Sequence, residues 1–194
     1  VGDDGVQKLS QGWGKDDKLT ALDLSSQNIG VAGAKALASA LRANLSITSV
    51  DCSRNGGLGD KGVALLTSTL LTDGTGASTI RELSLVRCAV GDPGAIALAQ
   101  ALRGNSVLDK LKLTGNFIGD TGAVALMNSL VSAGKSFLGE LSLSRNCIGP
   151  VGAEGIAEAL KKSPVLRELH LSGNDLGDMG VAALVRGAVT GESM

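Results

Sequence analysis

The chain has 194 residues, of which 43% are hydrophobic and 19% are charged, and its formal net charge is −1. This balance is typical of a globular protein and not of a disordered one. The low charge, with one Trp, two Phe and no Tyr, argues against a nucleic-acid partner, which would need cationic and stacking contacts. No apolar run reaches membrane-spanning length, so we expect no membrane association.

A short apolar motif recurs along the whole chain. The pattern L-x-x-L-x-L, with Ile, Val or Cys at some of its apolar positions, starts at residues 19, 47, 80, 108, 138 and 166. Its last three positions alternate apolar, polar and apolar, as a half-buried strand does. Each repeat therefore predicts one short β-strand.

A turn and a helix are expected after each strand. The turn often carries Asn and then an apolar residue followed by Gly-Asp-x-Gly, as at 116–122, and the helix has apolar residues three and four apart, as at 34–41. An aspartate at the start of several helices is predicted to be the N-cap of its own helix, by bonding the free amides of the first turn. These aspartates are Asp60, Asp92, Asp120 and Asp178.

The repeating strand, Asn-containing turn and helix resemble the long leucine-rich repeats of ribonuclease inhibitor, the NOD-like receptors and the Ran GTPase-activating protein. The resemblance implies an α/β leucine-rich-repeat solenoid, shaped as a horseshoe, with parallel strands on the concave side and helices on the convex side. We expect residues 1–194 to form a single such domain, in which 1–18 is a partial unit. Cys88 stands where other repeats have Asn, and the resemblance implies that this position bonds to the backbone of the turn.

The polar strand positions should point into the concave space, because strand side chains alternate. Three arginines follow just beyond the strands on the same rim. In this family the concave face often binds proteins, so these side chains are the predicted protein-binding site: Asp23, Ser49, Asp51, Glu82, Ser84, Lys110, Lys112, Glu140, Ser142, Glu168, His170, Arg54, Arg87 and Arg145.

Nothing in the sequence predicts catalysis, a cofactor or a metal. Residues 57–62 spell G-x-G-x-x-G, the dinucleotide-binding motif, but two of these glycines recur in every turn and so belong to the repeat. The three cysteines and the single His170 have no metal-site spacing. We therefore expect a protein-interaction scaffold or recognition module without catalytic activity or cofactor.

Two alternatives remain open. One is a GTPase-activating protein resembling the Ran activator, in which Arg54, Arg87 and Arg145 would be the candidate residues. The other is a structural spacer or an engineered repeat array. An intracellular, cytoplasmic location is expected because there is no disulfide framework or signal peptide. We expect a monomer or a part of a larger chain.

Overall fold

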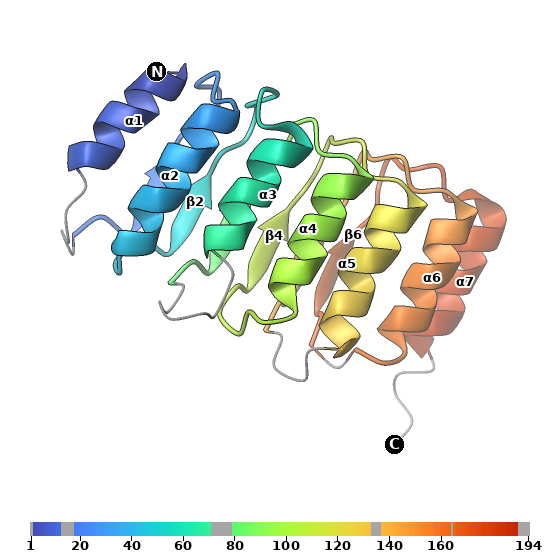
Figure 1. The fold of residues 1–194 in the computed structure, drawn as a ribbon. Helices are drawn as coiled ribbons and strands as arrows, with labels where there is room; N and C mark the ends of the chain where they lie inside the picture. The colour runs from blue at the N-terminus through green and yellow to red at the C-terminus, as the bar shows by residue number, and fades with distance from the viewer. Residues whose placement is uncertain (1, 13–17, 71–78, 133–136, 164, 190–194) are drawn as a thin grey trace.

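The computed structural model describes residues 2–12, 18–70, 79–132, 137–163 and 165–189. Helices and short strands alternate along it (Figure 1). Their bounds are α1 Gly2–Gly12, β1 Ala21–Asp23, α2 Val31–Ala43, β2 Ser49–Asp51, α3 Gly59–Leu70, β3 Glu82–Ser84, α4 Asp92–Leu102, β4 Lys110–Lys112, α5 Asp120–Ser132, β5 Glu140–Ser142, α6 Pro150–Leu160, β6 Glu168–His170 and α7 Gly177–Val189.

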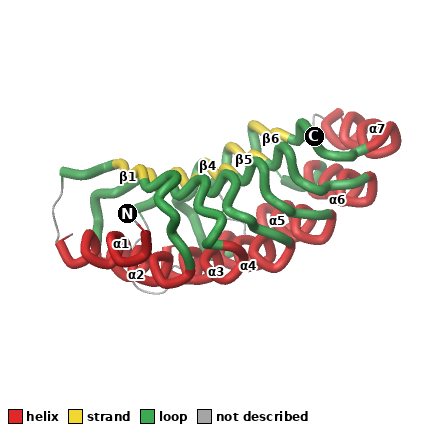
Figure 2. Tube along the Cα trace, turned by 90° about the horizontal axis from the view of Figure 1, so that it is seen from above, coloured by secondary structure: helices red, strands yellow, loops and turns green. Residues whose placement is uncertain are grey.

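The strands form one six-stranded parallel sheet in chain order, from β1 to β6. Corresponding positions of successive repeats pair with each other, so that Leu83, Leu111 and Leu141 lie side by side. The strands line one side of the molecule and the helices line the other (Figure 2). This arrangement confirms the predicted α/β leucine-rich-repeat solenoid.

The hydrophobic core lies between the sheet and the helices. The central residue of each inner strand points into it, and Leu83, Leu111 and Leu141 are fully buried. In the last repeat the corresponding Leu169 is only partly buried, because no further strand or helix in the described structure covers that side. Alanine and glycine line the facing helix surfaces, which lets neighbouring helices approach closely.

A ladder of asparagines holds the turns after the strands. Asn116 is buried, and its Oδ1 accepts from the backbone N–H groups of Cys88 and Val90 at 2.9 and 3.1 Å. Its Nδ2 donates to the carbonyls of Leu85 and Leu113, both at 2.8 Å. One side chain therefore satisfies four backbone groups of two repeats, as buried polar groups require.

Cys88 occupies the same position one repeat earlier and also bonds to the backbone. Its Sγ donates to the carbonyl of Cys52 at 3.1 Å. The expectation that Cys88 bonds to the backbone of the turn, as the asparagines do, is confirmed. A thiol makes fewer hydrogen bonds than an amide does.

For Asp60, Asp92 and Asp120, the prediction that the aspartate is the N-cap of its own helix was wrong, and for Asp178 it stays a prediction. Asp92 Oδ1 accepts from the N–H groups of Gly119 and Gly122, at 2.7 and 3.0 Å, at the start of the next helix. Asp60 does the same for Gly91 and Gly94, at 2.7 and 3.0 Å. Stacking places each carboxylate beside the following helix, so the aspartate links two repeats. It still satisfies amides of a first turn, which have no partner within their own helix.

Candidate protein-binding surface

The sheet presents a polar outer surface, here called the concave face. It consists of the first and third residue of each strand, whose side chains point away from the helices: Ala21, Asp23, Ser49, Asp51, Glu82, Ser84, Lys110, Lys112, Glu140, Ser142, Glu168 and His170. Every predicted strand position of the binding site is therefore on this face. The parallel register places equivalent residues of neighbouring repeats directly beside each other.

The two lysines in the middle of the concave face are paired with glutamates of the adjacent strands. Lys112 Nζ lies 2.5 Å from Glu82 Oε1 on β3, and Lys110 Nζ lies 3.1 Å from Glu140 Oε2 on β5. The hydrogen bond and the charge of Glu140 raise the pKa of Lys110 above its ordinary value, so this lysine stays charged. Exposed pairs of this kind add little to stability, so the positions of these charges are set mainly by the strands that carry them.

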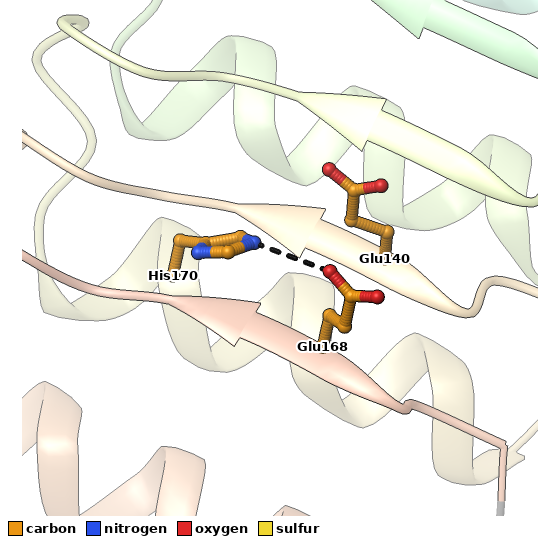
Figure 3. Close-up of side chains that lie close together, drawn as sticks. All are labelled: Glu140, Glu168 and His170. Atoms are coloured by element: carbon orange, nitrogen blue, oxygen red, sulfur yellow. Dashed lines mark ion pairs between the residues drawn. The ribbon is translucent and has the colours of Figure 1, made fainter.

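Besides its ion pair with Lys110, Glu140 also lies beside Glu168 and His170 of β6 (Figure 3). His170 Nε2 is 3.7 Å from Glu168 Oε2, and one ligand atom of each of the three side chains lies within 4.8 Å of the others. Carboxylates and imidazole can bind a divalent metal. A cation would have to compete with Lys110 for Glu140, however, and the absence of a metal stays a prediction.

Not every polar residue of the concave face is open to a partner. Ser84 is 6% exposed, and its Oγ lies 2.7 Å from Ser53 Oγ. The predicted contact residue Ser84 is therefore largely covered. Alternation alone does not reveal this, because the neighbouring turn supplies the covering hydroxyl.

The three predicted arginines lie along the rim where the strands end, Arg54 and Arg87 in adjacent repeats and Arg145 two repeats beyond Arg87. Arg54, Arg87 and Arg145 are exposed and occupy the same position of their repeats. Their backbone is left-handed, with φ between 54° and 58°, which side-chain-bearing residues rarely adopt. The equivalent residues of two other repeats are Gly115 and Gly173. The sequence already indicated this left-handed backbone, because two other repeats have glycine at the position of the arginines.

Two of the three cysteines are buried and poorly suited to nucleophilic chemistry. Cys52 and Cys88 are buried and Cys147 is exposed, and all three are free thiols. Burial raises the pKa of Cys88 to about 11 and also raises that of Cys52, so both stay protonated near neutral pH. A thiol kept in this form is a poor nucleophile.

The family model described as Leucine Rich repeat matches residues 17–38, 76–99, 104–127, 135–157 and 162–185, more than half of the chain. The chain belongs to the leucine-rich-repeat family. This confirms the resemblance drawn from the repeated strand and turn.

Two curated proteins are similar in sequence. The chain is 34% identical over 188 residues to the human "NACHT, LRR and PYD domains-containing protein 5", covering 96% of this chain and 15% of that protein. It is 31% identical over 153 residues to the ribonuclease inhibitor of Sus scrofa, covering 79% of this chain and 32% of that one. The leucine-rich-repeat chain thus spans a third or less of either relative.

Two solved structures share the fold. "Leiomodin-1 Actin-Binding Site 2 (ABS2)" superimposes with a TM-score of 0.50 at 17% identity, over 95% of this chain and 88% of that one. The tropomodulin C-terminal domain of Caenorhabditis elegans also gives 0.50, at 9% identity, over 97% and 92%. Such low identities support the architecture alone.

None of the helices in the described parts of the leucine-rich-repeat chain has the length and apolar character needed to cross a membrane.

Proposed function

We propose that this leucine-rich-repeat chain is a protein-binding module that does not catalyse a reaction. It recognises its partner through the concave face and through Arg54, Arg87 and Arg145, here called the arginine rim. The observation that carries this proposal is the row of charged side chains that the parallel register places on the sheet. Lys110 and Lys112 each stand beside a glutamate of a neighbouring strand, on elements held by the buried core. Such a surface selects partners by complementary charge.

The relatives support this reading through their names. One similar protein is an inhibitor of ribonuclease, and one structure of the same fold contains an actin-binding site. Both names refer to a protein partner. A role as a single binding unit over residues 1–194, and an intracellular location, belong to the same proposal. GTPase activation gains no support from the described residues.

The proposal predicts that reversing charge on the concave face abolishes partner binding. The bait would be the chain itself, used for affinity capture from a lysate of its native cells with identification by mass spectrometry. A second bait would carry Lys110→Glu, Lys112→Glu and Arg87→Glu. We expect a partner that the parent chain retains and the reversed chain loses, since three attractive contacts become repulsive.

The matched control makes the same change of charge on the convex helices. Lys35, Arg42 and Lys61 are exposed on α2 and α3, and their replacement by glutamate should leave capture unchanged. Circular dichroism would check that all baits are folded. Loss of the partner only with the convex variant would contradict the proposal and place the binding surface on the helices.

A further inference from the structure

The residues of the arginine rim stand at a turn position where the fold does not require arginine. The residue three places after the end of each strand has a left-handed backbone, and in the first five repeats its N–H donates to a carbonyl of the next repeat. Arg54 N donates to the carbonyl of Val86 at 2.7 Å, and Arg87 N to that of Thr114 at 3.0 Å. Glycine adopts this backbone without steric cost, and the chain uses it at Gly115 and Gly173. Arginine is therefore unfavourable for the turn, and its side chain needs another explanation.

The guanidinium groups have no partner within the described part of the chain. Arg54, Arg87 and Arg145 are exposed, and no ion pair or side-chain hydrogen bond engages them there. The nearest acid in sequence to Arg54 is Asp51, whose Oδ1 accepts from the backbone N–H of Ser53 at 2.8 Å. The lysines of the concave face, in contrast, are already paired with Glu82 and Glu140. The rim arginines are thus free to bind an anionic group.

Packing along the rim also keeps the arginines in place. A Cβ on Gly115 would lie 2.9 Å from Cγ of Arg87, and a Cβ on Gly173 would lie 2.9 Å from Cγ of Arg145. Each of these two arginines therefore extends over the glycine of the next repeat. The stem rests on a backbone that has no side chain, and the guanidinium group remains at the surface.

We infer that Arg54, Arg87 and Arg145 together bind an acidic, extended segment of a protein partner. The inference rests on the proposed protein-binding function and specifies the chemistry of the partner segment that is bound. Neighbouring strands are about 4.8 Å apart, so the three positions are separated by about one and two such steps. Side chains on one side of an extended peptide recur about every 7 Å, and arginine reach covers the difference. Planar guanidinium groups bind carboxylates through two parallel hydrogen bonds.

Nucleic acid would also present anions, but it fits the rim less well. The net charge of the chain is −1 and it contains no Tyr, so it lacks the broad cationic field and stacking side chains that nucleic acid uses. Asp23 and Asp51 stand on the concave face next to the rim and would repel a continuous phosphate backbone. A peptide with a few spaced carboxylates avoids much of this repulsion.

The test measures fluorescence anisotropy of a labelled synthetic peptide in which Glu alternates with Gly. The comparison probes are the same peptide with Gln in place of Glu, and a single-stranded oligonucleotide of equal length. We expect the acidic peptide to bind the parent chain, and to bind about tenfold or more weakly once Arg54→Gly, Arg87→Gly and Arg145→Gly are combined. The Gln peptide should not bind.

Glycine is the right replacement because it suits the left-handed backbone, so the melting temperature should stay the same or rise. A second set with Asn at the three positions retains side chains that tolerate this backbone and should lose binding equally. The matched control is Ser26→Gly, since Ser26 has φ 56° at the same position and carries no charge. It should leave the affinity of the peptide unchanged.

The inference is overturned if the acidic peptide fails to bind the parent chain, if the Gly and Asn sets bind like the parent, or if the oligonucleotide binds more tightly than the peptide. These outcomes are separable from failure of the proposed function. A captured partner that is lost with Lys110→Glu and Lys112→Glu, yet kept by the three Arg→Gly changes, would sustain concave-face binding and reject the arginine rim as the site of recognition.

Discussion

Replacing Leu111 by alanine should lower the free energy of unfolding by about 2–5 kcal/mol, the usual cost of a cavity at a fully packed leucine. Leu111 is the central residue of β4 and is fully buried, with Leu83 and Leu141 of the adjacent strands beside it. The core on both sides of it is complete, so the neighbours cannot move far enough to fill the space. Urea denaturation followed by circular dichroism measures the change.

The matched control for Leu111→Ala is Lys112→Ala, the next residue on the opposite side of the same strand. Lys112 loses only its partly exposed ion pair with Glu82, so we expect a change within about 1 kcal/mol. A second comparison is Leu169→Ala, which should cost less than Leu111→Ala because Leu169 is only partly buried. Equal unfolding curves for Leu111→Ala and the parent chain would show that the packing described for β4 is incorrect.

The second large effect is expected for Asn116→Ala, which should cost about 4 kcal/mol or more because it leaves four buried backbone groups unpaired, each at a cost of about 1–3 kcal/mol. The amide bonds to Cys88 N, Val90 N, Leu85 O and Leu113 O, and Asn116 is 3% exposed. Water has little access to these groups once the side chain is removed. The same denaturation experiment gives the loss.

Asn174→Ala is the control for this prediction. Asn174 makes the same kind of bonds, to Asn146 N, Ile148 N, Leu143 O and Leu171 O, but it is only partly buried. Water can replace some of the lost bonds there, so the cost should be clearly smaller. If the two alanine variants lost the same free energy of unfolding, burial would not be the cause of the large effect expected for Asn116→Ala.

The repeat is what made the fold predictable from the sequence. Six copies of one strand motif and its turn fix the type and order of the elements, since every copy repeats the same local evidence. The polar strand positions followed from alternation, and Cys88 from its place among the asparagines. These features depend on position within a repeat, which the sequence states directly.

What the sequence analysis missed depends on contacts between repeats. Asp92 caps the next helix and not its own, because stacking brings the carboxylate closer to Gly119 than to the amides of α4. Ser84 is covered by Ser53 of the preceding repeat for the same reason. The Lys110–Glu140 pair was within reach of prediction, since aligning the motifs places these two residues at the same position of adjacent strands.

Lysine acetylation footprinting of the captured complex tests most directly whether the concave face is the binding surface of this leucine-rich-repeat chain. Lys110 and Lys112 report on the concave face, and Lys35 and Lys61 report on the exposed side of helices α2 and α3. The proposed binding mode predicts that bound partner slows acetylation of Lys110 and Lys112 and leaves Lys35 and Lys61 as reactive as in the free chain. Protection of Lys35 and Lys61, with Lys110 and Lys112 unaffected, would contradict it.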